Sequence, residues 1–328
     1  MEKKAPLLIF TFMKKLSSKI KKFLLYRLMR SCYYLLSRIY LFIQCQIYEA
    51  FYTRSVRVSK QSGVSAIKRD PELIISLTTI PERIRKVSLC LDTLLRQSLK
   101  PDRVILWLSQ SDEPDQPRID KQTLPDDLLR LVDRGLEIRW CKDIRSYRKI
   151  IPTLHAHPNA LIVTADDDIF YPRDWLKALT EAYHREPEYI HCHRAHLMKY
   201  SSAGVLLPYR QWEFLAPGYL KPSLDLFPTS GGGVLYAPGH LHAEVLNERA
   251  FLNLCPMADD VWLKAMSLLN NVLCKKVTPL TFSMIEIRIS RNRTLSSDNL
   301  ERDGNDPQIR AVGEVYGVFP SAGKLKNS

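Results

Sequence analysis

The sequence lacks any closely spaced pair of cysteines. Its seven cysteines are scattered along the chain and odd in number, and none belongs to a CxxC pair. This pattern argues against a disulfide framework and indicates reduced, mostly buried thiols in an intracellular protein. The seven are Cys32, Cys45, Cys90, Cys141, Cys192, Cys255 and Cys274.

A long apolar run is also missing from the N-terminal part of the chain. Residues 5–13 are apolar, and the longest charge-free run in the segment that follows is 39–48, ten residues long. A helix that spans a bilayer needs about 20 apolar residues, so both runs are too short. Residues 5–13 also lack a small-residue cleavage site, which argues against a secretory signal.

The positive charge is confined to one part of the chain. The formal net charge is +13, but residues 1–69 hold 15 basic and 2 acidic residues, whereas the rest of the chain holds 33 of each sign. A basic groove for nucleic acid across the body of the protein is therefore disfavoured.

Residues 14–54 favour one long helix, because they are rich in Leu, Ile, Phe and Tyr and contain neither proline nor glycine. Basic residues interrupt the apolar ones, so we expect a basic amphipathic helix in the interface of an anionic membrane. The expected location is cytoplasmic, peripheral on the inner face of the cell membrane. The alternative is a helix packed on the rest of the chain or on a second copy. Residues 54–70 are polar and predict a linker.

From Leu73 onward the pattern alternates between strands and helices. It predicts strands at 73–79, 103–109, 136–141 and 161–165, and helices at 84–97, 124–132 and 146–155. Such alternation at short spacing predicts an α/β fold with a mostly parallel sheet and helices on both faces. We therefore divide the chain into an N-terminal helical segment with its linker, 1–69, and an α/β domain, 70–328.

The stretch 160–174 (ALIVTADDDIFYPRD) is the most informative part of the domain. A short apolar run typical of a buried parallel strand ends in three adjacent carboxylates, Asp166, Asp167 and Asp168. Ligands of open α/β sheets bind at the carboxyl ends of the strands. Adjacent carboxylates repel one another unless a cation compensates, and Mg²⁺ is typically held by one or two carboxylates together with substrate phosphates. The stretch predicts a metal–diphosphate site; a solvated acidic turn is the alternative.

Four sequence blocks in order resemble bacterial glycosyltransferases of the GT-A (nucleotide-diphospho-sugar transferase) fold, most of all the family 2-like enzymes that build surface polysaccharides. The blocks are 78–83 (TTIPER), the strand ending at 166–168, 229–236 (TSGGGVLY) and 258–266 (ADDVWLKAM). The resemblance covers residues 73–316. It implies a nucleotide-sugar donor with UDP as the default nucleotide, Mn²⁺ or Mg²⁺, a saccharide or lipid-linked acceptor, and inverting transfer with one Asp base.

The resemblance implies a metal and donor site at the ends of the first and fourth strands. Asp168 and Asp166 are the expected metal ligands, Asp166 facing the metal or the ribose, and Asp167 is expected to help hold the site.

The same resemblance places donor-binding residues after the first strand. The turn that contains Thr78, Thr79 and Pro81 is expected to meet the nucleobase and ribose. Arg83 is expected at the diphosphate, and Lys149 resembles a lysine that binds the donor. The alternatives are an exposed arginine at a helix start and a solvated lysine on a helix surface.

The usual Glu-Asp pair of the family stands here as Asp259-Asp260, a departure at the first position. Asp260 is the expected general base, and Asp259 is expected to support it or to bind the acceptor. A helix begins at this pair, and its dipole favours ionised carboxylates, although ordinary N-capping is the alternative. A glycine-rich loop is expected to bind the acceptor through close backbone approach. Its residues are Gly231, Gly232 and Gly233.

Two further patterns are weaker. The histidines of an HxH pattern suggest zinc, but no further ligands follow at finger spacing, so a partly buried strand is favoured. A late arginine-containing segment suggests a lid over the diphosphate, with surface solvation as the alternative. The histidines are His191, His193 and His196, and the arginines are Arg288, Arg291 and Arg293.

Two rival functions remain open. A nucleotidyltransferase also uses aspartates and a metal, but it needs a phosphate-cradling glycine loop after the first strand, and residues 78–83 contain no glycine. A non-catalytic interaction protein, bound to the membrane and built on a decayed transferase fold, is the second rival.

Overall fold

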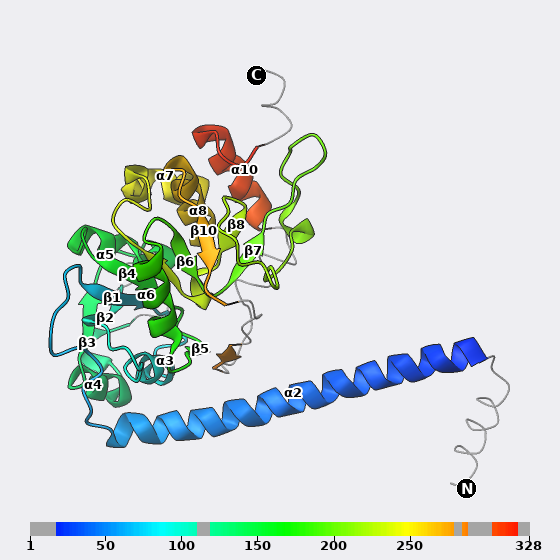
Figure 1. Ribbon diagram of the computed structural model, residues 1–328. Helices are drawn as coiled ribbons and strands as arrows, with labels where there is room; N and C mark the ends of the chain where they lie inside the picture. Colours follow the sequence, from blue (N-terminus) through cyan, green and yellow to red (C-terminus); the bar gives the residue numbers. More distant parts are fainter. Residues whose placement is uncertain (1–17, 110–118, 279–283, 288–303, 321–328) are drawn as a thin grey trace, which may run out of the picture. The chain divides into compact units, whose positions relative to one another are not determined.

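The computed structural model describes residues 18–109, 119–278, 284–287 and 304–320 (Figure 1). The chain divides into two compact units, Met1–Tyr48 and Glu49–Ser328. The second unit contains every described strand and all of the predicted site residues. The division falls before the predicted boundary at residues 69 and 70, because residues 49–69 make contacts with the sheet-bearing unit, as described below.

Helix α2 (Ser18–Val58) confirms the predicted long N-terminal helix. Large apolar side chains are exposed at the consecutive positions 33–36 and 39–43. Because an α-helix turns every 3.6 residues, such runs cover its whole circumference. The predicted one-sided amphipathic helix is therefore wrong: apolar side chains are not confined to one face. Of the helices that the structure describes, none combines the length and the apolar character needed to cross a membrane.

A seven-stranded sheet in the order β10–β6–β9–β4–β1–β2–β3 forms the centre of the second unit. β1 pairs in parallel with β2 and β4, β2 with β3, and β10 with β6, whereas β9 is antiparallel to both β4 and β6. The predicted α/β class and mostly parallel sheet are confirmed. The strands are β1 (Leu73–Thr78), β2 (Arg103–Leu108), β3 (Leu136–Trp140), β4 (Leu161–Thr164), β6 (Ile190–Cys192), β9 (Val234–Tyr236) and β10 (Cys274–Lys276).

The strand order reverses between β1 and β4. From β1 the chain adds β2 and then β3 on one side, and it then crosses to place β4 on the other side of β1. In open α/β sheets the crevice for a ligand forms at such a switch point, outside the carboxyl ends of the strands. The topology therefore places the residues after β1 and β4 at the same edge of the sheet.

Helices flank the sheet (Figure 1). They are α3 (Val87–Leu94), α4 (Asp126–Val132), α5 (Ile151–Ala156), α6 (Trp175–Arg185), α7 (Glu248–Leu254), α8 (Asp259–Leu269) and α10 (Asn305–Tyr316). Short 3-10 turns are η1 (Lys121–Thr123), η2 (Arg145–Lys149), η3 (Tyr209–Gln211), η4 (Ser230–Gly232) and η5 (Ala243–Leu246). Two small antiparallel sheets pair β5 (Ile169–Phe170) with β11 (Ile285–Glu286) and β7 (Ala195–Leu197) with β8 (Leu226–Pro228).

Two local features differ from the sequence-based expectations. The predicted helix at 146–155 is split into η2 and α5, and Ile150 between them has φ −134°. Pro152 explains the break, because proline lacks the N–H of a continuous helix and restricts the backbone before it. The small sheets escaped prediction because strands of two or three residues are too short to show a period.

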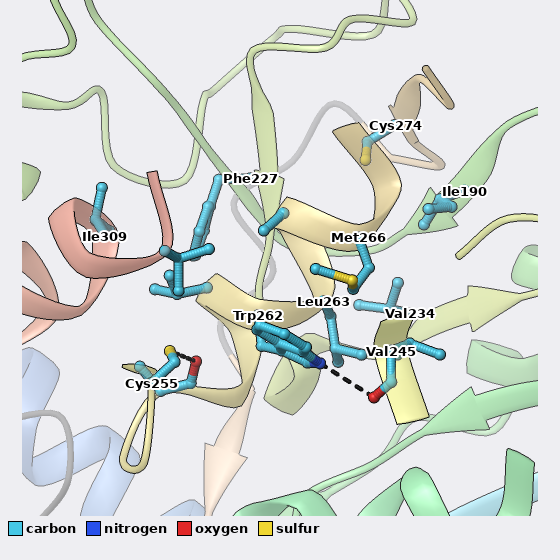
Figure 2. Packing of buried hydrophobic residues seen from close by; sticks show 14 of the residues in the cluster. Ile190, Phe227, Val234, Val245, Cys255, Trp262, Leu263, Met266, Cys274 and Ile309 are labelled. Carbon is cyan, nitrogen blue, oxygen red and sulfur yellow. Dashed lines mark hydrogen bonds between the residues drawn. The ribbon is translucent and has the colours of Figure 1, made fainter. Parts of the chain in front are cut away.

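Helix α8 is embedded in a hydrophobic core (Figure 2). Trp262 and Met266 on α8 are wholly buried, and Phe227 on β8 belongs to the same cluster. Trp262 Nε1 donates to the carbonyl oxygen of Val245 at 3.1 Å, so its polar atom is satisfied. Full burial of a large apolar side chain contributes about 1.5–3 kcal/mol. This packing fixes the position of the first turn of α8.

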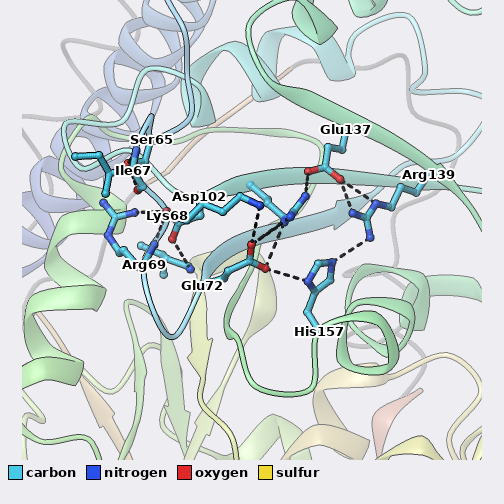
Figure 3. A network of polar contacts seen from close by, with 11 residues as sticks. Ser65, Ile67, Lys68, Arg69, Glu72, Asp102, Glu137, Arg139 and His157 are labelled. Atoms are coloured by element: carbon cyan, nitrogen blue, oxygen red, sulfur yellow. Dashed lines mark hydrogen bonds and ion pairs between the residues drawn. The ribbon is translucent and has the colours of Figure 1, made fainter.

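A network of charged side chains joins the amino ends of the first three strands (Figure 3). Arg103 Nη1 donates to Glu137 at 2.7 Å, and its Nε donates to Glu72 at 3.2 Å. His157 Nδ1 lies 3.2 Å from Glu72, and Arg139 Nη1 lies 3.1 Å from His157 Nε2. These ion pairs hold together the strand ends opposite the switch-point crevice.

The C-terminal turns of α2 are attached to α3 through a buried carboxylate. Asp92 on α3 is fully buried and accepts hydrogen bonds from Ser55 on α2 and from Arg134. Arg96 Nε donates to the same carboxylate at 3.0 Å. Arg134 is also buried, and its Nε donates to the carbonyl oxygen of Gln61 at 3.1 Å. Asp92 thus connects α2 to Arg134, just before β3, and Arg134 in turn connects to the segment after α2.

We expect Asp92→Ala to lower the free energy of unfolding by about 3–5 kcal/mol, because Arg134 is left buried without its partner. The matched control is Glu181→Ala, which breaks the exposed Lys177–Glu181 pair and should cost no more than about 0.5 kcal/mol. Urea unfolding followed by circular dichroism measures both. A loss below about 1 kcal/mol for the Asp92 variant contradicts the assigned role, since an unpaired buried charge costs more than that.

Candidate active site

A cavity of about 670 Å³ lies at the carboxyl ends of β1 and β4. Three parts of the chain line it: the segments after β1 and β4 together with η2, the first turn of α8 with the loop before it, and the β7–β8 region with the start of α10. Its size is typical of a small-molecule site. The cavity therefore occupies the switch point of the sheet, where a ligand is expected.

Lys149 at the end of η2 joins two of the predicted aspartates. Its Nζ lies 2.8 Å from Asp166 Oδ1 and 3.1 Å from Asp259 Oδ2. Burial alone would lower the pKa of the Lys149 ammonium, but the two carboxylates raise it well above its ordinary value. Burial likewise acts to raise the pKa of Asp166, but the ion pair with Lys149 outweighs it and lowers that pKa. Both groups are charged at neutral pH.

Arg83 neutralises part of the charge of the other two aspartates. Its Nη1 lies 2.7 Å from Asp167 Oδ1 and 3.1 Å from Asp168 Oδ2. Thr79 Oγ1 donates to Asp167 Oδ2 at 2.5 Å. Burial raises the pKa of Asp167 despite these partners, and burial together with Asp166 raises that of Asp168 to about 6. Arg83 therefore offsets only part of the effect of burial on the pKa values of these two carboxylates.

Asp259 and Asp260 form the first turn of α8 and line the cavity. Asp260 Oδ1 accepts hydrogen bonds from the backbone N–H of Ser230, at 2.9 Å, and from its hydroxyl. Burial and the neighbouring Asp259 raise the pKa of Asp260 to about 6, against the opposing effect of Lys149. Asp259 Oδ2 is buried without a hydrogen bond in the described part of the chain, although Lys149 lies beside it. The N-cap residue of α8 is Ala258, so neither aspartate occupies the capping position.

The predicted glycine loop is buried and packs against the site. A side chain at Gly231 would collide with Asp166 Oδ2, and one at Gly233, where φ is +98°, would collide with Trp175. The carbonyl oxygen of Gly232 accepts from Trp175 Nε1 at 2.8 Å. None of the three glycines lines the cavity. Their role in binding an acceptor stays a prediction; the geometry gives them a packing role that lets the chain approach Asp166.

The structure brings most of the predicted site residues together. Thr78, Thr79 and Arg83, Lys149, Asp166 and Asp167, and Asp259 and Asp260 all line the same cavity. Pro81 lines a separate hollow beside α4. Asp168 is not among the lining residues; its carbonyl oxygen accepts from Ile287 N at 2.7 Å, next to the β5–β11 pair.

The histidines of the HxH pattern are bonded to the backbone. His191 Nε2 and His193 Nε2 each lie within hydrogen-bond distance of a backbone carbonyl, and His196 Nδ1 accepts from Leu215 N at 3.0 Å. Each of the three histidines thus has a backbone partner. The late arginines of the expected lid, Arg288, Arg291 and Arg293, lie outside the described residues.

Several residues of the site belong to no sequence motif that predicts their role. Ser230 precedes the three glycines, and Arg194 follows the HxH pattern, but neither position by itself indicates a place in the site. Arg194 lines the cavity and its Nε donates to Thr229 Oγ1 at 2.6 Å. The aromatic side chains of the cavity, which include Tyr209 and Phe214, come from a loop-rich region without a motif. Only tertiary contact identifies these residues.

The described residues contain no cluster of three or more His, Cys, Asp or Glu side chains arranged to hold a metal ion. Asp166 and Asp168 fit a divalent ion in a more limited way. They offer oxygen ligands, and burial together with the neighbouring Asp166 raises the pKa of Asp168 to about 6. Mg²⁺ accepts one or two carboxylates when phosphate oxygens and water supply the rest. The pair therefore fits an ion that is shared with a bound diphosphate.

No model of a known protein family matches the chain, and no curated protein matches it. Its function is inferred below from the cavity and from the sequence blocks that surround it.

We expect Lys149→Met to lower the free energy of unfolding by about 3–5 kcal/mol at pH 7, because two carboxylates lose their buried cation. In the native protein the lowered pKa of Asp166 stabilises the fold above its unfolded pKa, and this contribution disappears as the pH falls. In the variant burial raises that pKa, so the deficit should shrink at about pH 4.5, where more of Asp166 is protonated. Urea unfolding at both pH values measures the difference.

The control for this prediction is Lys142→Met. Lys142 pairs with Glu248 at the surface, so its loss should change the free energy of unfolding by less than about 0.5 kcal/mol at either pH. An equal deficit at both pH values for the Lys149 variant would show that its charge is not the cause.

Proposed function

We propose that the protein is a metal-dependent glycosyltransferase of the GT-A fold. It transfers a sugar, with inversion, from a nucleoside-diphosphate donor, UDP-sugar being the first choice, to a saccharide or lipid-linked acceptor. One observation carries the proposal: carboxylates from two segments far apart in sequence face one cavity at the switch point of the sheet. They are Asp166 and Asp167 after β4, and Asp259 and Asp260 on α8.

The polar end of the cavity suits the donor. Thr78 and Arg83 line it after β1, and Arg83 is held by two carboxylates, at 2.7 and 3.1 Å. Asp166, which lines the cavity, and Asp168, which lies beside it against Arg83, would hold a Mn²⁺ or Mg²⁺ ion. When bound together with the donor, such an ion offsets the negative charge that develops on the leaving diphosphate.

Asp260 is the proposed general base. Transfer breaks the bond between the sugar C1 and the β-phosphate oxygen, whose electron pair leaves with the nucleoside diphosphate. A bond forms between C1 and the acceptor hydroxyl oxygen, and the hydroxyl proton passes to the Asp260 carboxylate. Ser230 holds Oδ1 of that carboxylate, which leaves Oδ2 to take the proton. A base with a pKa of about 6 is ionised at neutral pH and still able to accept a proton.

The test is a screen of nucleotide sugars with Mn²⁺ or Mg²⁺, scored by release of nucleoside diphosphate and by sugar transfer. We expect Asp260→Asn to lower the transfer rate by about 10²–10⁴-fold, the usual contribution of a general base, with nucleotide affinity unchanged. The wild-type rate should fall as the pH drops below about 6, because Asp260 becomes protonated.

The control variant is Asp133→Asn, an exposed aspartate outside the cavity, which should transfer at the wild-type rate. Release of pyrophosphate instead of nucleoside diphosphate would indicate a nucleotidyltransferase. Absence of binding and turnover with every donor and both metals would refute the enzymatic proposal.

We further propose that α2 docks the protein on the cytoplasmic face of an anionic membrane. No acidic residue occurs between positions 3 and 48, and this region holds ten basic residues. Exposed apolar side chains such as Leu35, Phe42 and Ile43 accompany them. Basic side chains are attracted to an anionic lipid surface, and the exposed apolar side chains add apolar contact with it.

Vesicle flotation tests this docking. The full chain should bind vesicles that contain phosphatidylserine and should not bind pure phosphatidylcholine. The triple variant Arg27→Gln, Arg30→Gln and Arg38→Gln should bind about 100-fold more weakly, at about 1 kcal/mol per charge. Equal binding to both lipids, or a dimer in solution that binds neither, would contradict the proposal.

A further inference from the structure

Part of the cavity lining differs in chemistry from the carboxylates. It consists of His196 on β7, Tyr209 on η3, Phe214 and Leu215 in the following loop, and Phe227 on β8. We call these five residues the aromatic wall. The ring centroids of His196 and Phe214 lie 4.6 Å apart, and those of Tyr209 and Phe214 lie 5.4 Å apart. The four rings of the wall are packed against one another, and Leu215 adds an aliphatic side chain.

The aromatic wall carries no formal charge at neutral pH. His196 Nδ1 accepts from Leu215 N, so the proton of the neutral ring is on Nε2. Burial lowers the pKa of His196 to about 4, and the charge of Arg194 acts in the same direction. A diphosphate would gain nothing from such a surface, since phosphates are recognised by arginine, lysine or oriented backbone N–H groups. The wall suits a neutral ligand.

Asn305 adds a polar group that points to the kind of ligand. It is the first residue of α10, is 4% exposed and lines the cavity. Its Oδ1 is buried without a hydrogen-bond partner in the described part of the chain. Asp306 Oδ1 accepts from Tyr209 N at 2.9 Å, which fixes the start of α10 to the wall. A buried, unpaired carbonyl oxygen is costly unless a ligand supplies a donor.

We propose that the aromatic wall and Asn305 form the subsite for the acceptor, a neutral sugar ring. A pyranose presents a face of C–H groups that packs on aromatic rings, and its edge carries hydroxyls that donate to an amide oxygen. This assignment rests on the proposed function and deepens it. It assigns acceptor binding to residues that line the cavity, whereas the three glycines do not line it.

The position of the wall agrees with the transfer step. Phe227 and Ser230 are three residues apart in the chain, so their backbones lie within about 11 Å of each other. Ser230 holds the carboxylate of Asp260. Asp260 and the aromatic wall line the same cavity, and the Asp260 charge acts to raise the pKa of Tyr209, so a sugar ring on the wall shares the cavity with the proposed base.

Ligand-observed NMR with methyl β-glucoside, methyl β-galactoside and methyl N-acetyl-β-glucosaminide tests the subsite, with uridine diphosphate and Mg²⁺ as a separate probe. The wild-type protein should bind at least one glycoside. Phe214→Leu keeps the apolar character and removes the ring, and it should weaken that binding at least about 10-fold, with nucleotide affinity unchanged, since the stacking surface is lost. Asn305→Ala should likewise weaken glycoside binding and leave the nucleotide affinity unchanged.

The reciprocal control is Arg83→Met, which should weaken the binding of uridine diphosphate and leave the binding of the glycosides unchanged. Thermal unfolding of each variant shows that it is folded, and Asn305→Ala replaces Phe214→Leu if the latter is not. Wild-type protein that binds none of the glycosides, or a folded variant that binds them normally, overturns the subsite. Failure to bind the nucleotide while the glycosides still bind counts against the proposed transfer and leaves the sugar subsite standing.

Discussion

The buried ammonium of Lys149 is the constraint on which the site depends. It connects Asp166 at the end of β4 to Asp259 in the first turn of α8, two segments almost a hundred residues apart. Removing three charged groups from water is costly, and only their close mutual contact offsets this cost. The ion pairs therefore hold the first turn of α8 to the end of β4, together with the hydrophobic packing of α8. They also keep Asp166 ionised although burial opposes it.

The lining of the cavity has two chemically different parts. The carboxylates belong to the switch point of the sheet, where backbone topology gathers the residues after β1 and β4, and to the first turn of α8. The aromatic part is built by the β7–β8 region and the start of α10, and its rings are packed against one another. Asp260 is held by Ser230, and burial and Asp259 raise its pKa. One oxygen of the Asp260 carboxylate is thus held by Ser230, and the proposed role as general base falls to the other.

Helix α2 differs from the rest of the chain in how it is stabilised. Its last turns are held by the buried Asp92, which bonds to Ser55 and Arg134. Its earlier turns expose apolar side chains on every side. Isolated helices gain little from local propensity, and most helical stability comes from packing. The proposed docking on lipid would give these exposed turns a surface to pack against.

The sequence alone determined the α/β class, the mostly parallel sheet, the long N-terminal helix and the acidic end of β4, because hydrophobic periods and adjacent carboxylates are local properties. The motif resemblance also pointed to Asp260 and Lys149. Only the tertiary structure decided that Lys149 bridges two aspartates, that Ser230 holds Asp260 and that Asp168 stays outside the cavity. It alone revealed the aromatic wall and the apolar side chains on every side of α2. The physical reason is that contacts between distant segments, and the burial that shifts a pKa, arise only when the chain is packed.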